Sequence, residues 1–148
     1  MSESNPIRVF VTHAFTEDED YLRVFEFLES NERFFYVNVS QPDNIPSGGF
    51  EEIKDELIKQ IKDAETVFVT TQSYLSKPDL VRFQMQAALA QGTPLLGIAP
   101  FGGVVPLPEE IESKAIEILD WNERDFADAL RRHARLQDTS RWDVIDFP

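Results

Sequence analysis

The chain contains no cysteine, so disulfide bonds, thiolate nucleophiles and thiolate metal ligands are all excluded. It has only two histidines, His13 and His133, which lie far apart in the sequence without ligand residues at metal-binding spacing around them. We therefore expect no metal site. The lack of cysteine is also typical of proteins in a reducing compartment, and we expect a cytoplasmic location.

Basic residues are scarce. Fourteen Lys and Arg stand against 27 Asp and Glu, which gives a formal net charge of -13. Such a negative field repels phosphate backbones and anionic lipid headgroups, so we expect neither nucleic acid nor a membrane surface as a partner. No apolar run approaches the roughly 20 residues of a membrane-spanning helix. Residues 1–6 lack the basic and apolar pattern of a secretion signal, and we expect a soluble, unsecreted protein.

The apolar residues make up 42% of the chain and include twelve Phe, enough to form one buried core. A length of 148 residues fits a single domain. We expect an α/β domain over residues 1–136. Residues 137–148 then form a tail whose apolar residues alternate with acids, so that it packs on the same domain or extends from it.

Strand-like and helix-like segments alternate along the chain. Short runs of β-branched, aromatic and aliphatic residues predict buried strands at 7–12, 34–39, 66–71, 94–99 and 116–119. Helical spacing of apolar residues predicts helices near 16–30, 50–61, 79–91, 109–114 and 123–136. Thr16 and Glu19 have capping-box spacing at the first helix, and Asn122 is a candidate N-cap of the last.

This alternation predicts a parallel sheet with right-handed crossovers and helices on both faces. We therefore predict a three-layer, doubly wound α/β fold of the flavodoxin-like type, with strand order 2-1-3-4-5. Ligands of such folds bind at the carboxyl ends of the strands, near the ends of the first and third strands here. The nucleotide-binding candidates at this edge are His13, Ala14, Phe15, Ser40, Asn44, Ser47, Gln72, Ser73 and Phe101.

This chain lacks the residues that several functions of similar folds require. A phosphorelay receiver needs an acidic pair after the first strand and an Asp at the end of the third, but those positions carry THA at 12–14 and TQ at 71–72. A Walker loop and a GxGxxG turn are also absent. The first strand is followed by acids where a flavodoxin needs a phosphate loop. His13 and Ser73 could meet at the edge, but an isolated His and Ser are more often structural than a base and nucleophile.

Four segments, in this order, resemble the TIR-like domains of bacterial and archaeal signalling and anti-phage systems, including the TIR partner of the Thoeris system. They are VFVTHAF at 9–15, FFYVNVSQPD at 34–43, LVRFQMQAALAQGTPLLGIAPFG at 80–102 and ILDWN at 118–122. The resemblance spans almost the whole chain. It implies a TIR-like fold and a module that acts through self-association or through another signalling or defence protein. It also implies NAD as a candidate ligand or substrate, with no required cofactor.

Enzymatic members of that family are NAD glycohydrolases or cyclases, with a glutamate of the third helix beside the nicotinamide ribose. The resemblance aligns Gln84, within VRFQM at 81–85, with that glutamate. A neutral amide cannot stabilise the positive charge that builds on the ribose as the glycosidic bond breaks. Three interpretations stay open: the domain binds without cleaving, another acid such as Glu17 or Asp79 serves, or Gln84 lies on a solvated helix face.

The serines of the family's first-strand signature are also replaced here, by Thr12 and Ala14. The favoured hypothesis is a signalling or anti-phage module that acts through protein association, with nucleotide binding and without NAD cleavage. The alternative is an active NAD glycohydrolase, a cyclase or a related nucleoside-processing enzyme.

Overall fold

The computed structural model describes residues 1–135. The predicted tail at 137–148, and residue 136 of the predicted domain, lie outside the described residues. Five strands form a single sheet in the order β2-β1-β3-β4-β5, and every neighbouring pair is parallel. The predicted flavodoxin-like α/β fold and its strand order are thereby confirmed. Within the described residues, no helix has the length and apolar character needed to cross a membrane.

The three central strands are mostly apolar and buried because helices cover both of their faces. They are β1 (Ile7–Val11), β3 (Thr66–Thr70) and β4 (Leu95–Ile98). The two edge strands are shorter and more exposed, namely β2 (Tyr36–Asn38) and β5 (Glu117–Leu119). The sheet register places Val9 beside Thr66 and Phe10 beside Val67.

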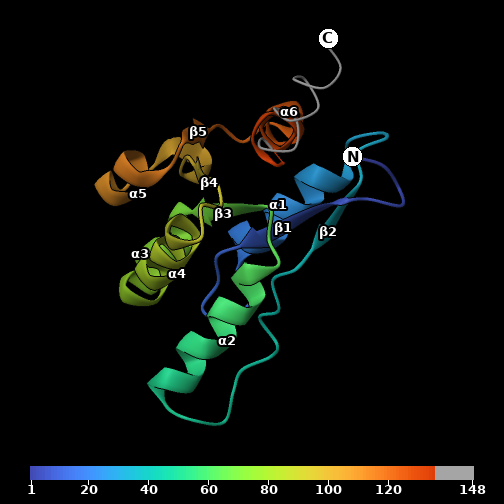
Figure 1. The fold of residues 1–148 in the computed structure, drawn as a ribbon. Coiled ribbons are helices and arrows are strands. Elements are labelled where there is room, and N and C mark those ends of the chain that lie inside the picture. Colours follow the sequence, from blue (N-terminus) through green and yellow to red (C-terminus); the bar gives the residue numbers. More distant parts are fainter. Residues whose placement is uncertain (136–148) are drawn as a thin grey trace.

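Two hydrophobic clusters lie on opposite faces of the sheet. On one face, α1 (Glu19–Glu29) and α6 (Glu123–His133) pack against Val9 and Val11. On the other face, α2 (Phe50–Lys62), α4 (Pro78–Ala90) and α5 (Glu109–Lys114) contribute side chains to a cluster that includes Phe10. Figure 1 shows this sandwich, with α1 and α6 on the side of the sheet away from α2 and α4.

The structure corrects two details of the predicted helices. Helix α1 begins at Glu19, and its N-cap is Asp18, whose side chain accepts a hydrogen bond of 2.8 Å from the backbone N–H of Tyr21. The predicted Thr16 cap is therefore wrong. A short helix that was not predicted, α3 (Thr71–Ser76), follows β3 directly and is capped by the Thr70 hydroxyl. A single 3-10 turn, η1 (Phe101–Gly103), follows β4.

At the amino end of the sheet, Glu65 joins the two ends of the described chain. Its Oε1 accepts from the backbone N–H of Arg8 at 3.0 Å and from Nη2 of Arg135 at 2.9 Å. The same Arg135 nitrogen donates to the carbonyl of Pro6 at 2.7 Å. Burial raises the pKa of Glu65, but hydrogen bonds and charge from Arg135 and Arg8 outweigh burial and leave the pKa below its usual value. Glu65 therefore stabilises the fold as a carboxylate.

Candidate functional site

The candidate site is the carboxyl edge of the sheet, where β1 and β3 end. From there the chain continues toward β2 after β1 and toward β4 after β3, on opposite sides of this strand pair. The segment after β1 runs through His13 to the first turn of α1, and the segment after β3 forms α3. Because neighbouring parallel strands end at the same edge, residues 12–15 and 71–73 come together there. This is the region in which the candidate residues were predicted.

Gln84 projects from α4 and clamps the backbone just after β1. Its Oε1 accepts from the backbone N–H of His13 at 2.9 Å, and its Nε2 donates to the His13 carbonyl at 2.7 Å and to the Leu80 carbonyl at 3.2 Å. The side chain has no solvent exposure. The interpretation that Gln84 lies on a solvated helix face is therefore wrong. Its amide already has partners on both sides, so its visible role is structural.

The imidazole of His13 is buried and held as a neutral ring. Its Nδ1 accepts from the backbone N–H of Phe15 at 3.1 Å, so that nitrogen carries no proton. The proton is therefore on Nε2, which donates to Oε1 of Gln60 at 2.9 Å. Burial lowers the pKa of His13 below its ordinary value of 6.5, against the opposing effects of Gln60 and Glu56. His13 is thus poorly suited to carry a positive charge in the folded protein.

Gln60 extends this network to the loop after β2. Its Oε1 also accepts from the backbone N–H of Gln41 at 2.9 Å, while its Nε2 donates to the Gln41 carbonyl at 3.1 Å and to Glu56 at 2.8 Å. Oε2 of Glu56 in turn accepts from the side-chain amide of Asn44 at 2.9 Å. Hydrogen bonds of Gln60 and Glu56, both on α2, therefore connect the start of the 40–49 loop to the imidazole of His13.

A cluster of hydroxyl groups closes the gap between the ends of β1 and β3. Oγ of Ser73 lies 2.8 Å from Oγ1 of Thr12 and 3.0 Å from Oγ1 of Thr70, and it donates to the Thr70 carbonyl at 3.1 Å. All three side chains are buried. Ser73 and His13 are not hydrogen-bonded to each other, because His13 is directed to Gln60 instead. The arrangement is a structural cluster and does not present a nucleophile beside a base.

One hollow opens beside β2 on one flank of the first turn of α1. We call it the β2-side pocket; its volume is about 500 Å³, and its lining includes Glu17, Tyr21, Asn38, Ser40, Asp43 and Asn44. The phenol of Tyr21 lies 2.8 Å from Oγ of Ser40 and accepts from Nδ2 of Asn38 at 2.9 Å. The lining is mostly polar and suits a ligand with several hydrogen-bonding groups.

A second hollow lies on the other flank of α1, between the ends of β3 and β4. We call it the β4-side pocket; its volume is about 300 Å³, and its lining includes Asp20, Arg23, Gln72, Leu75, Phe101 and Val105. The guanidinium of Arg23 pairs with Asp20 and lies 3.7 Å from the centroid of the Phe101 ring. Burial raises the pKa of the Asp20 carboxyl and outweighs the opposing charge of Arg23.

The nine predicted candidates therefore separate into distinct groups. Ser40 and Asn44 line the β2-side pocket, and Gln72 and Phe101 line the β4-side pocket. The remaining candidates line neither pocket: His13 and Ser73 are buried, Ala14 and Phe15 are half-buried, and Ser47 is exposed.

Sequence reasoning missed four residues that shape the edge. They are Asp20, Tyr21 and Arg23 of α1 and Gln60 of α2. Asp20 and Arg23 resemble ordinary exposed residues of an acidic helix start, and Gln60 falls on the apolar stripe of its helix. The three-residue spacing of Asp20 and Arg23 is the available signal, since residues at this spacing share a helix face.

Within residues 1–135, no group of three or more His, Asp or Glu side chains could hold a metal ion. Comparisons of this sequence with protein-family models and with curated proteins find no match.

Proposed function

We propose that this chain is a TIR-like signalling or anti-phage defence module that binds a nucleotide-type ligand at the carboxyl edge of its sheet without cleaving it. The module acts through protein association. The observation that carries this proposal is the environment of Gln84, the residue that takes the place of the glutamate in the family's enzymes. Its amide is buried and hydrogen-bonded to the backbone of His13 and Leu80.

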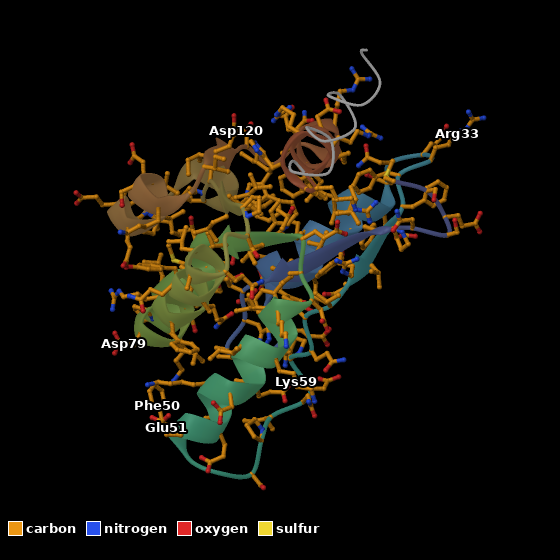
Figure 2. The ribbon with its side chains drawn as sticks, viewed as in Figure 1. Arg33, Phe50, Glu51, Lys59, Asp79 and Asp120 are labelled. Atoms are coloured by element: carbon orange, nitrogen blue, oxygen red, sulfur yellow. The ribbon has the colours of Figure 1, made fainter. Side chains whose placement is uncertain are left out.

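The positions of the two acids considered as substitutes for the glutamate are a second argument against cleavage. Glycosidic cleavage of NAD builds positive charge on the ribose, which a nearby carboxylate stabilises. Of the acids considered as substitutes, Asp79 forms an ion pair of 2.9 Å with Arg82, and its side chain is 93% exposed. Figure 2 shows Asp79 directed outward from the start of α4. Glu17 lines the β2-side pocket, where Tyr21, Ser40 and Asn38 bond to one another.

Exposed apolar side chains support association as the mode of action. A groove between α2 and α4, the α2–α4 groove, has a volume of about 410 Å³ and is lined by Ile58, Phe83, Gln86, Ala87, Ala90 and Gln91. Ile58 is 45% exposed there, and Phe50 is 55% exposed at the start of the same helix. Exposed apolar side chains beside a groove are typical of protein contacts, and a second copy of the chain is the partner that we propose.

Incubation with NAD tests the ligand-binding part of the proposal. We expect NAD to cause saturable changes in the NMR spectrum at Ser40, Asn44 or Gln72, and no nicotinamide to be released over hours. Release above that of a protein-free control would reject the non-cleaving function. Absence of saturable change at millimolar NAD would reject nucleotide binding.

Analytical ultracentrifugation tests association. The native chain is expected to form a concentration-dependent dimer that Ile58→Asp weakens. Leu22→Asp is the matched control, because Leu22 is 46% exposed on α1, on the opposite face of the sheet. A monomer at all concentrations, or equal weakening by both variants, would reject the second-copy interaction.

A buried carboxylate at the same edge favours one alternative function, an active NAD glycohydrolase or cyclase. The side chain of Asp20 is 9% exposed, has a raised pKa and lines the β4-side pocket. Perturbed carboxyl groups in clefts are frequent in active sites. If the chain released nicotinamide and Asp20→Asn abolished the release, this alternative would replace the non-cleaving function.

A further inference from the structure

The lining of the β4-side pocket includes a largely buried carboxylate, that of Asp20, with unused hydrogen-bonding capacity. Oδ1 of Asp20 pairs with Arg23, whereas the described residues provide no donor to Oδ2. The Asp20 side chain is only 9% exposed, so water solvates it poorly. A buried carboxylate is stabilised by each additional N–H that reaches it. The pocket is therefore suited to a ligand that brings a donor to this point.

Gln72 places a donor in the same pocket. Its Oε1 accepts from the backbone N–H of Asp20 at 2.8 Å, which fixes the orientation of the side-chain amide. Its Nε2 has no acceptor among the described residues. The pocket thus offers an acceptor from Asp20 and a donor from Gln72. Together they can recognise a ligand edge that carries a donor next to an acceptor.

Part of the lining of the β4-side pocket is apolar. Leu75, Phe101 and Val105 line it and are 53%, 49% and 43% exposed, respectively. Arg23 over the Phe101 ring adds a flat, cationic surface on which an aromatic ring can stack. Apolar walls around a few polar groups are typical of sites for planar small molecules rather than for hydrated ions.

We propose that the β4-side pocket binds an amino-substituted nitrogen heterocycle, the chemical class that includes the adenine base. The amino group donates to Asp20, and the neighbouring ring nitrogen accepts from Nε2 of Gln72. The volume of about 300 Å³ accommodates a base but lies at the lower end for small-molecule sites. This inference rests on the proposed nucleotide-type ligand and assigns its base to one of the two pockets.

Charge determines which part of a nucleotide enters this pocket. The chain carries a formal charge of -13, and Glu19 lines the pocket beside Asp20. Arg23, the cation of this pocket, is paired with Asp20, so the charge of Glu19 and of the whole chain disfavours a phosphate there but not a neutral base. We therefore expect adenosine to bind at least as tightly as its monophosphate, and tighter binding of the monophosphate would contradict the assignment.

NMR titration of the full chain with adenosine tests the proposal, with purine riboside as the matched ligand because it lacks only the amino group. We expect saturable shifts at the side-chain amide of Gln72 and the backbone amides of Leu75 and Val105. Purine riboside should bind at least about tenfold more weakly, since it leaves Oδ2 of Asp20 without a donor. Equal affinity of the two nucleosides would overturn the proposed recognition.

Two variants separate binding from folding. Asp20→Asn should weaken adenosine at least about tenfold, and Phe101→Ala, which alters a half-exposed wall, should weaken it about fivefold or more. Asp79→Asn is the control for Asp20→Asn, because Asp79 also pairs with an arginine three residues later but is 93% exposed. If Asp20→Asn did not fold, Phe101→Ala alone would decide. Unchanged affinity in a folded pocket variant would overturn the site.

The outcome also separates this inference from the proposed function. If NAD shifts only residues of the β2-side pocket and adenosine leaves the β4-side pocket unchanged, the base site is wrong while nucleotide binding stands. If neither molecule binds, both proposals fail.

Discussion

Gln84 stabilises the fold through an amide that both donates and accepts. Two backbone carbonyls, those of His13 and Leu80, accept from its Nε2, so a carboxylate at this position would face two acceptors without a proton to share. A buried carboxylate oxygen that faces carbonyl oxygens, with no donor between them, strongly destabilises the folded state. The consequence is that a glutamate cannot replace Gln84 without cost to the fold.

We predict that Gln84→Glu lowers the free energy of unfolding by about 3 kcal/mol, measured by urea denaturation at neutral pH. Gln86→Glu is the matched control, because Gln86 lies on the same helix and is exposed. It should change stability by less than about 0.5 kcal/mol. If the two variants were equally stable, the hydrogen bonds of Gln84 would not contribute as described.

The neutral imidazole of His13 predicts a loss of stability on mild acidification. Its folded pKa lies below the ordinary 6.5, chiefly because of burial, so the unfolded chain binds the proton first as the pH falls. This stabilisation is complete above about pH 6.5 and is lost as the pH falls from there toward the folded pKa. Urea denaturation at about pH 7.5 and about pH 5.5 should show the decrease, and His13→Asn should reduce it. An NMR titration of His13 with a midpoint at or above 6.5 would contradict this prediction.

At the scale of single elements, the start of α1 shows how a local hydrogen bond places a helix. Asp18 lies in extended backbone, and its carboxylate accepts from the N–H of Tyr21. The acidic residues that follow, Glu19 and Asp20, lie at the positive end of the helix dipole. The helix start also positions Asp20 and Tyr21, which line the β4-side pocket and the β2-side pocket, respectively.

We predict that Asp18→Ala costs about 1 kcal/mol of stability, as expected for the loss of an N-cap. Thr16→Ala, at the position where the sequence predicted the cap, should change stability by less than about 0.5 kcal/mol. Thermal and urea unfolding of both variants would check the difference. A larger effect at Thr16 would restore the capping box as the start of this helix.

The elements differ in how far the sequence could predict them. The central strands β1, β3 and β4 were predicted because burial on both faces favours short runs rich in β-branched, aromatic and aliphatic residues. Helix α3 was not predicted, because TQSYLS at 71–76 has no apolar periodicity and its cap comes from the last residue of β3. The role of Gln84 was equally hidden: its partner His13 lies 71 positions away, and only the completed sheet brings them together.

At the scale of the whole molecule, Glu65 connects elements that are distant in sequence. It bonds to Arg8 near the start of the chain and to Arg135, the last described residue. Because the folded pKa of Glu65 is lowered, its contribution is present above its ordinary pKa of 4.5 and is lost as the pH falls through the folded pKa. Acid should therefore weaken the contacts by which Glu65 connects Arg8 and Arg135.

We predict that Glu65→Gln lowers the free energy of unfolding at neutral pH by about 2 kcal/mol and flattens its decrease below about pH 4.5. Glu51→Gln is the control, since Glu51 also pairs with a basic side chain, Lys54, but is 80% exposed. Figure 2 shows Glu51 at the outer end of α2, far from β3. If the free energy of unfolding of Glu65→Gln decreased as steeply at acidic pH as that of the native chain, other carboxyl groups would be responsible for the decrease.

The clamp between α4 and the turn after β1 also bears on protein design. A design that places an acid at residue 84 would have to rebuild the turn first, so that the carbonyls of His13 and Leu80 face elsewhere. The side chain at residue 84 and the course of the backbone after β1 therefore have to be redesigned together.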